Sequence, residues 1–382
     1  MRITLRRNYR QRKRKKKRSA AQTALRLLLA VAAVLLLAGL AIVGYSQYGR
    51  LRLQKRAQSE GPQLASEAAS ETTTGEAQLP WKESYVRYDG EIYDYNSDIL
   101  TFLFMGIDKQ DTVVQQSESG VDGGQADALF LLVLNPRTKE MSVIGLNRNT
   151  MTDIDVYDEN GGFIATTKAQ LAVQHGFGDG REESCRLQEK AVRRLMYDLP
   201  IHGYCAINMS AVPTINDAVG GVDVTVLEDL TRYDSSLQEG AQVHLEGQQA
   251  YLYVRSRETD EFASADSRLR RQKQYLQAFL QKAASQARSD VTSVARLYRA
   301  IEPSMVTDIT ADEALYLAGT AAGYRFGKDN FYMLPGETTM GENGYEEFHV
   351  DEDALYRLIL GVFYEKVNTA AQERPETAQS TE

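Results

Sequence analysis

The strongest constraint on the fold is an apolar stretch over residues 98–108, DILTFLFMGID. Between its two terminal acids it has no charged residue and no regular alternation of polar with apolar positions. A strand of this composition is typical of a sheet that helices cover on both faces. We therefore expect an α/β protein in which this strand passes Gly106 and leaves the sheet at Asp108.

A hairpin is predicted next in the chain. The stretch DALFLLVLNPRTKEMSVIGLNRNT reads as two strands joined by a turn at Asn135–Pro136. A hairpin is antiparallel, so the sheet must be mixed. If the loop has four residues, Asn135 pairs with Glu140, and the same register places Asp127 opposite Arg148.

Other segments show helical or strand patterns that would complete the fold. Pro200 ends one helix, and Gly220–Gly221 closes another. Thr310 and Glu313 form a capping-box pattern at the start of a third. We predict helices over residues 183–201, 210–219, 245–254, from Asp266 onward, 310–318 and 351–367, and strands over residues 203–209 and 222–226.

The N-terminal part of the chain predicts a membrane anchor. Of 44 Lys and Arg residues, 11 lie in residues 1–18, which contain no acid, leaving 33 against 52 acids beyond them. Residues 27–45 are uncharged and overwhelmingly apolar, long enough to span a hydrocarbon core of roughly 30 Å. The basic residues before this span place the N-terminus in the cytoplasm. A cleaved signal peptide is the alternative, but the apolar run is too long and the following cleavage site is poor.

The domain organisation follows from these shifts in composition. Residues rich in Ser, Thr, Glu and Ala flank the apolar core of the chain and cannot bury enough surface to fold. We predict a cytoplasmic basic tail (1–24), a transmembrane helix (25–46), a flexible linker (47–83), a catalytic domain (84–285), helices and strands completing it (286–367), and a disordered tail (368–382). The protein is thus expected in the cell membrane as a single-pass protein, with its main domain extracytoplasmic. Because the basic tail adjoins the membrane and has one aromatic residue, we expect it to contact anionic membrane lipid rather than nucleic acid.

The two cysteines, Cys185 and Cys205, both lie in the exported part. A disulfide is chemically permitted there, but we favour two separately buried thiols. With the scattered histidines, two cysteines do not form a tetrahedral zinc site.

Arginines gather late in the predicted catalytic domain. Five of them fall within seventeen residues: Arg255, Arg257, Arg268, Arg270 and Arg271. An extended Arg-Ser-Arg segment would point Arg255 and Arg257 to the same side. On a helical wheel Arg268 and Gln272 border the buried stripe, Arg271 lies farther out and Arg270 faces solvent.

These residue types together indicate a pyrophosphate ligand. Carboxylates such as Asp108 and Asp127 can hold Mg²⁺ or Mn²⁺, and arginine forks can hold the bridged phosphates. Nucleotides are scarce outside the cell, so a lipid-linked pyrophosphate is the expected ligand. The alternative without a functional role is that the arginines lie on a solvent-exposed helix face and that the two aspartates are ordinary turn residues.

Taken in order, these motifs resemble the LytR-CpsA-Psr family of cell-wall proteins over roughly residues 97–283. The quoted segments are FMGID, QADALFLLVLNPRTKEMSVIGLNRNT, AINMSAVPTINDAVGGVDV and LEGQQAYLYVRSR followed by DSRLRRQ. The resemblance implies an α/β/α sandwich with a central mixed sheet. It also implies transfer of a glycopolymer, of wall teichoic acid or capsule type, from a polyprenyl-pyrophosphate carrier to peptidoglycan.

The resemblance also implies roles for single residues. Asp108 and Asp127 would bind the metal, and Asp127 and Arg148 would be catalytic. The implied substrate-binding residues are Arg148, Lys168, Arg255, Arg257, Arg268 and Gln272, and we add Arg271 as a candidate. No general base is obvious, and Asp127 is the suggested one.

The chain departs from the family pattern at several positions. The family has an arginine two residues before the second acid and a hydroxyl residue after it, where this chain has Gln125 and Ala128. Asn147 and Asn149 replace a proline and an aspartate, and Gln170 replaces an asparagine. These departures affect the finer phosphate contacts. The alternative functions are a polyprenyl-pyrophosphate hydrolase and a non-catalytic, polyanion-binding envelope regulator.

Overall fold

The computed structural model describes residues 43–53, 55–56, 61–66, 81–109, 123–257, 262–290, 292–321 and 323–367. Most of the predicted membrane span and both predicted tails lie outside these residues. Within them, no helix combines the length and the apolar character that a membrane crossing requires.

The core of the molecule is a six-stranded mixed sheet. Its strand order is β11-β8-β3-β4-β5-β12, in which β3 pairs parallel with β8 and antiparallel with β4. The strands are β3 (Leu100–Ile107), β4 (Ala126–Asn135), β5 (Glu140–Leu146), β8 (Gly203–Asn208), β11 (Met305–Thr307) and β12 (Phe331–Met333). The predicted mixed sheet is confirmed, and the last two strands come from the segment expected to complete the domain.

The register of the β4–β5 hairpin is the predicted one. Asn135 pairs with Glu140, and the ladder continues to Leu129 opposite Leu146. Two residues farther along each strand lie Asp127 and Arg148.

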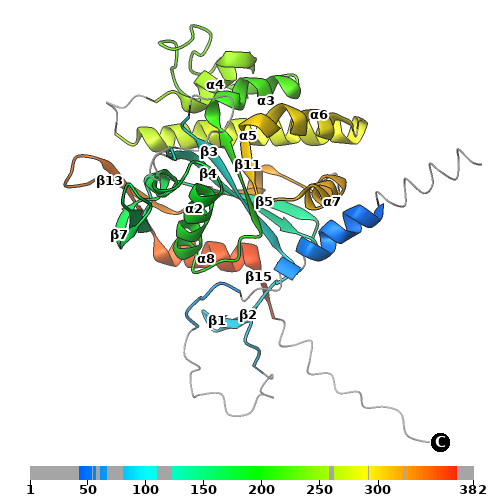
Figure 1. Ribbon diagram of the computed structural model, residues 1–382, viewed down its shortest axis with the longest axis vertical. Coiled ribbons are helices and arrows are strands. Elements are labelled where there is room, and N and C mark those ends of the chain that lie inside the picture. Colours follow the sequence, from blue (N-terminus) through cyan, green and yellow to red (C-terminus); the bar gives the residue numbers. More distant parts are fainter. Residues whose placement is uncertain are drawn as a thin grey trace, which may run out of the picture.

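Helices cover both faces of the sheet, because its strands are apolar on both sides (Figure 1). Leu103 and Leu129 belong to the core cluster beneath α2 (Glu182–Leu195) and α8 (Glu352–Phe363). On the opposite face lie α5 (Ser264–Ser289), α6 (Thr292–Ile301) and α7 (Ala311–Ala321). The smaller helices are α3 (Val212–Ala218), α4 (Gly247–Arg255), η1 (Leu171–Phe177), η2 (Met209–Ala211), η3 (Glu302–Ser304) and η4 (Lys328–Asn330).

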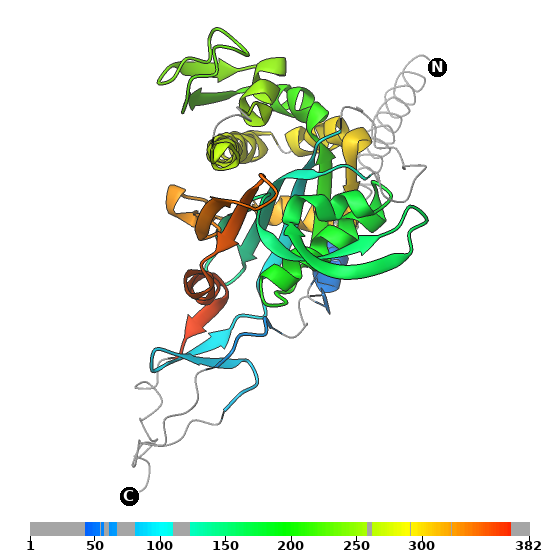
Figure 2. The ribbon, with the colours of Figure 1, turned by 90° about the vertical axis from the view of Figure 1, so that its left-hand side faces the viewer.

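Smaller sheets surround this core. Figure 2 shows the β6–β7 hairpin projecting on one side and the small sheet β1-β2-β15 at the lower end. Their strands are β1 (Tyr85–Tyr88), β2 (Glu91–Tyr95), β6 (Met151–Tyr157), β7 (Phe163–Gln170), β9 (Val222–Thr225), β10 (Gln242–Leu245), β13 (Gly336–Met340), β14 (Glu346–Val350) and β15 (Tyr364–Lys366). Since β15 pairs with β2, the two ends of the folded region are joined.

Local signals explain where the helices start and stop. The backbone N–H of Thr310 donates to Glu313 Oε2 at 2.9 Å, which is one half of the predicted capping box. The helix predicted to run to Pro200 ends earlier, at Leu195, because Tyr197 and Asp198 take left-handed φ values of 54° and 59°. Both cysteines are free and buried, as we favoured.

Part of the segment predicted as a flexible linker is instead a packed helix over residues 43–53 (Figure 1). Leu53 is fully buried in a cluster with Leu100 and Phe102. Arg52 Nη1 lies 3.7 Å from Asp312 Oδ1 at the start of α7. A Cβ on Gly49 would lie 2.2 Å from the Asp312 carbonyl oxygen, so only glycine permits this approach. We call residues 43–53 the docked helix.

Gly49→Ala should release the docked helix, whereas Gly44→Ala should not. Both changes favour helix by up to about 1 kcal/mol, but a Cβ at Gly44 has open space around it. We expect trypsin to cleave at Arg50 and Arg52 much faster in the full-length Gly49→Ala chain than in the wild type, and at an unchanged rate in Gly44→Ala. Equal cleavage of the two variants would show that the contact with Asp312 does not hold the helix.

His202 should make the fold acid-sensitive. Burial lowers its pKa from 6.5 to about 4, and Nδ1 accepts from the backbone N–H of Thr101 at 2.8 Å. The unfolded chain therefore binds more protons between these values. The stabilisation is complete above pH 6.5 and is lost as the pH falls towards 4, on the order of 3 kcal/mol.

Urea unfolding of the full chain at several pH values measures this dependence. His202→Asn keeps an acceptor but cannot titrate, so its free energy of unfolding should fall less between pH 6.5 and 4 than that of the wild type. A residual slope is expected from His175, whose pKa burial also lowers to about 4. Parallel curves for the two chains would rule out His202 as a source.

Candidate active site

Three predicted site residues meet at one end of the central sheet. Asp108 directly follows β3, Asp127 is the second residue of β4, and Arg148 follows β5. A bulge between Gly106 and Ile107 shifts the β3–β4 register there. Because β3 runs opposite to β4 and β4 opposite to β5, these three positions lie at the same end of the strands.

The hairpin brings Asp127 against two arginines. Arg148 Nε lies 2.9 Å from Asp127 Oδ1, as the register predicted. Arg268, one turn into α5, donates from Nη1 to Asp127 Oδ2 at 2.9 Å. The side chains are almost buried: Asp127 is 9% exposed, Arg148 12% and Arg268 6%. One carboxylate is thus shared by two guanidinium groups, and the trio has a net positive charge.

This trio keeps unused hydrogen-bond donors. Arg268 Nη2 and Arg148 Nε are buried, and neither donates a hydrogen bond to any described residue. For Arg148 this means that the short distance to Asp127 is a charge contact and not a well-directed hydrogen bond. Burial lowers the pKa of Arg268 to about 10, although Asp127 opposes this, so Arg268 stays charged at neutral pH. Buried cations with free donors favour an anionic ligand.

Asp108 has its own arginine partner. Arg255 Nη2 donates to Asp108 Oδ1 at 3.0 Å, and both side chains are about one third exposed, at 38 and 36%. Arg255 is the last residue of α4, so it is helical and not extended as we predicted. The helix ended later than the sequence pattern indicated.

Arg257 does not point to the same partner as Arg255. Its Nη2 donates to Glu346 Oε2 at 2.8 Å, and its Nε donates to Ser264 Oγ at 2.8 Å. The prediction that both arginines share one side is therefore not met in this structure. Glu346, from β14, was not among the predicted residues.

The helical wheel was right for three residues of α5 and wrong for one. Arg268 and Gln272 face inward, and Arg270 is exposed. Arg271, predicted to lie farther out, is only 1% exposed and donates to Glu228 and to the carbonyls of Tyr253 and Ser256. The wheel failed because α4 packs on a second side of α5.

Lys168 lies apart from the arginines. Its Nζ is 3.2 Å from Asp153 Oδ1 across the β6–β7 hairpin, and its side chain is 67% exposed. No contact between described residues joins it to Asp108 or Asp127.

The two carboxylates are a suitable donor set for a hard cation. Asp108 and Asp127 come from adjacent strands, and Mg²⁺ commonly takes one or two carboxylates and completes its shell with water and substrate phosphate. In the structure both acids are paired with arginines. Among the described residues there is no group of three or more His, Cys, Asp and Glu side chains that could hold a metal ion by itself.

An apolar cavity of about 330 Å³ adjoins these charges. It lies between the sheet and helices α5 and α6, and its wall includes Phe104, Phe130, Tyr275, Phe279 and Ile301. Val254 and Gln272 also line it, next to Arg255 and one turn after Arg268. The cavity is therefore lined by residues next to the arginines in the chain, a feature that the sequence alone did not reveal.

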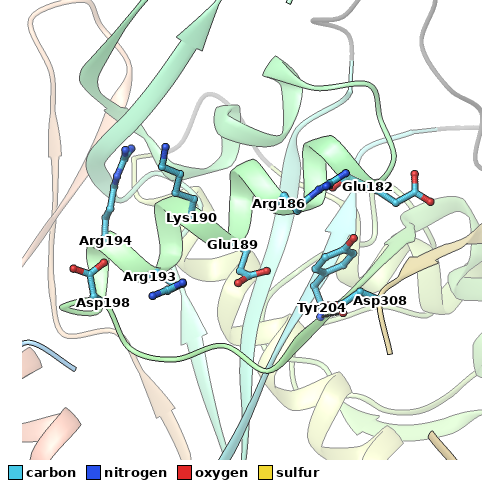
Figure 3. A pocket seen from close by; sticks show the side chains of 9 residues that line it. All are labelled: Glu182, Arg186, Glu189, Lys190, Arg193, Arg194, Asp198, Tyr204 and Asp308. Carbon is cyan, nitrogen blue, oxygen red and sulfur yellow. Dashed lines mark hydrogen bonds between the residues drawn. The ribbon is translucent and has the colours of Figure 1, made fainter. Parts of the chain in front are cut away.

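A second hollow lies elsewhere, along α2 (Figure 3). It has a volume of about 730 Å³ and carries both acids and bases. Two of its cations, Lys190 and Arg194, form ion pairs with Asp155 at 2.7 and 2.8 Å. Because they are already paired, they would attract an anionic ligand less strongly. None of the predicted site residues lines it.

Arg271 and Arg270 should respond differently to the same substitution. Arg271→Lys cannot reproduce the three-way contact and would leave Glu228 and two carbonyls short of donors, so we expect a loss of stability on the order of 3 kcal/mol. Arg270→Lys, on the exposed face, should change the free energy of unfolding by less than about 0.5 kcal/mol. Urea unfolding of both variants makes the comparison, and a stable Arg271→Lys chain would show that these contacts do not hold α5 to α4.

The chain is 29% identical over 217 residues to the polyisoprenyl-teichoic acid--peptidoglycan teichoic acid transferase TagU of Bacillus cereus (strain AH820), covering 57% of this chain and 63% of TagU. It is 25% identical over 305 residues to TagV of Bacillus subtilis (strain 168), a transferase of the same description, covering 76% of this chain and 69% of TagV. The matched region thus spans less than two thirds of TagU.

Solved structures show the same fold. Crystalline B. subtilis TagV superposes with a TM-score of 0.51 at 22% identity, covering 69% of this chain and 95% of TagV. TagT bound to LI-WTA superposes with a TM-score of 0.51 at 19% identity, covering 69% of this chain and 89% of TagT. The LytR_cpsA_psr family profile matches residues 51–359, from the docked helix to α8. The resemblance seen in the motifs is therefore confirmed: the chain belongs to the LytR_cpsA_psr family.

Proposed function

We propose that this protein transfers a glycopolymer from a polyprenyl-pyrophosphate carrier to peptidoglycan. One observation carries the proposal: an arginine cluster with free donors lies beside an apolar cavity, whose lining includes Ala128, Val254 and Gln272. A ligand that fills both must have an anionic head and an apolar tail. Polyprenyl pyrophosphate has this form.

The head of the carrier would lie among Arg148, Arg255 and Arg268. Their guanidinium forks are suited to phosphate oxygens, and the free Nη2 of Arg268 is available without breaking its bond to Asp127. Gln272, whose Nε2 donates to the carbonyl of Val254 at 3.2 Å, would lie where the head meets the tail. The isoprenoid would occupy the cavity between the sheet and α5.

The reaction would be a phosphoryl transfer. A hydroxyl of peptidoglycan attacks the phosphorus on the sugar side, and the bond from that phosphorus to the bridging oxygen breaks. The glycopolymer is then joined to peptidoglycan through a phosphodiester, and polyprenyl phosphate departs with the bridging oxygen. The arginines neutralise charge on the leaving group, which is the main contribution that fixed charges make to such reactions. We assign Asp127 as the carboxylate that accepts the hydroxyl proton.

Mg²⁺ or Mn²⁺ would be held by Asp108 and Asp127 together with the pyrophosphate. When bound, the metal supplies additional neutralisation of the phosphate oxygens. Arg255 would have to turn from Asp108 to the phosphate, which its partial exposure permits.

The names of TagU and TagV give their donor as polyisoprenyl-teichoic acid and their acceptor as peptidoglycan. We propose a donor of the same class here, a teichoic acid or capsule-type polymer. We also propose that residues 25–46 anchor the protein in the cell membrane and that the domain lies outside the cell. Both fit a substrate whose carrier lies in the bilayer.

The test uses the full-length protein in detergent with a polyprenyl-pyrophosphate-linked oligosaccharide, a peptidoglycan oligomer and Mg²⁺. We expect a phosphate-linked adduct by mass spectrometry. EDTA should abolish it, and Asp127→Asn should lower its rate at least about 100-fold, because a shared counter-charge and a metal ligand are lost together. Arg270→Lys, on the exposed face of the same helix, is the matched control and should retain activity.

Other products would identify the alternatives. Sugar phosphate released without adduct would indicate the hydrolase. Tight binding without metal and without turnover would indicate the polyanion-binding regulator. Full activity in EDTA would reject the metal and leave an arginine-only transferase.

A further inference from the structure

A buried carboxylate from a distant part of the chain reaches the arginine cluster. Glu346 begins β14, and it is 8% exposed. Its Oε2 accepts from Arg257 Nη2 at 2.8 Å and from Asn149 Nδ2 at 3.1 Å. Its Oε1 accepts from the backbone N–H of Ser264 at 3.3 Å. A single side chain therefore connects β14, the segment around Arg148 and the first turn of α5.

Most of these contacts do not depend on Arg257. The carbonyl oxygen of Glu346 accepts from Gln170 Nε2 at 2.7 Å, and Phe348 donates its N–H to the carbonyl of Asn149 at 2.9 Å. The main chain and neutral partners thus hold the carboxylate in place independently of Arg257. A carboxylate held in this way can orient a cation, because it does not move to meet it.

The same hairpin holds α5 at a second point. Thr338, on β13, donates to Asp266 Oδ2 at 2.7 Å, and Asn147 donates to Asp266 Oδ1. Ser264 and Asp266 both belong to the first turn of α5, and Arg268 follows. The β13–β14 hairpin therefore determines where this helix begins relative to Asp127.

Arg257 is left with one free edge. Nε and Nη2 bind Ser264 and Glu346, and Nη1 has no hydrogen bond to a described residue. Two fixed acceptors on one side of a planar guanidinium define the direction of its remaining donors. Without Glu346, Arg257 would keep only the hydroxyl of Ser264.

We propose that Glu346 is a positioning residue, which orients Arg257 and the first turn of α5 for binding of the pyrophosphate head. The inference rests on the proposed function. It differs from the view that Glu346 is a competing anion that the substrate displaces. A positioning residue strengthens substrate binding, whereas a competing anion weakens it, so the two views predict opposite signs.

Glu346→Gln tests the sign, and Glu347→Gln is its matched control. Glu347 is the next residue of β14 and lies on its other face, 3.3 Å from His349. Calorimetric titration of each full-length variant with the polyprenyl-pyrophosphate-linked oligosaccharide gives Kd. We expect Kd to rise roughly tenfold in Glu346→Gln, equivalent to about 1.4 kcal/mol, and to stay unchanged in Glu347→Gln. In turnover assays KM should rise while kcat changes less than about threefold, since the contact is made in the ground state and the transition state alike.

A double-mutant cycle separates positioning from general damage. If Glu346 acts through Arg257, Glu346→Gln should cause little further loss in an Arg257→Met background. Full additivity of the two losses would overturn the proposal. Glu346→Asp, which keeps the charge but retracts it, should give an intermediate Kd and serves if Glu346→Gln does not fold.

The other possible binding results also test the proposal. A wild-type Kd in Glu346→Gln, or tighter binding, would overturn the positioning role. A wild-type protein that does not bind the lipid-linked substrate would overturn the proposed function and this inference with it. Binding by the wild type with no effect at Glu346 would overturn the inference alone.

Discussion

The contact of Asp127 with Arg148 and Arg268 is the interaction on which the site depends. It joins the open end of the β4–β5 hairpin to α5, which lies more than a hundred residues later in the chain. Burying three charges is costly unless each has a partner, and here two cations share one anion. Asp127 neutralises only one of the two positive charges, and some arginine donors have no acceptor. A bound phosphate would supply both the missing negative charge and the missing acceptors.

The arrangement around this contact serves to hold the arginines in place. Arg271 fastens α5 to the end of α4 and so determines where Arg255 emerges. Two small residues in the lining of the apolar cavity, Gly106 and Ala128, help to keep it open. Gly106 and Ala128 face each other in the β3–β4 ladder, and a Cβ on Gly106 would lie only 3.1 Å from that of Ala128. Larger residues at these positions would close the cavity next to the charges.

The sequence predicted those parts of the site that depend on local geometry. The register of Asp127 opposite Arg148 follows from a hairpin with a readable loop, because antiparallel pairing fixes every later pair. Arg268 and Gln272 follow from helical periodicity. Arg271 could not be ranked correctly, since its burial depends on carbonyls of another helix. Glu346 had no local signal, because β14 lies late in the chain and meets the cluster only through tertiary packing.

The docked helix has a consequence for how the proposed transferase would reach its donor. It begins within the segment that the sequence assigns to the membrane, and Leu53 ends it inside the folded core. If residues 27–45 cross the bilayer, the domain has almost no slack with respect to the lipid surface. Its encounters with a lipid-borne donor then become a two-dimensional search at fixed height, in which lateral diffusion and the orientation of the domain replace the reach of a tether. Only acceptor strands of the wall that lie within that narrow layer could be modified.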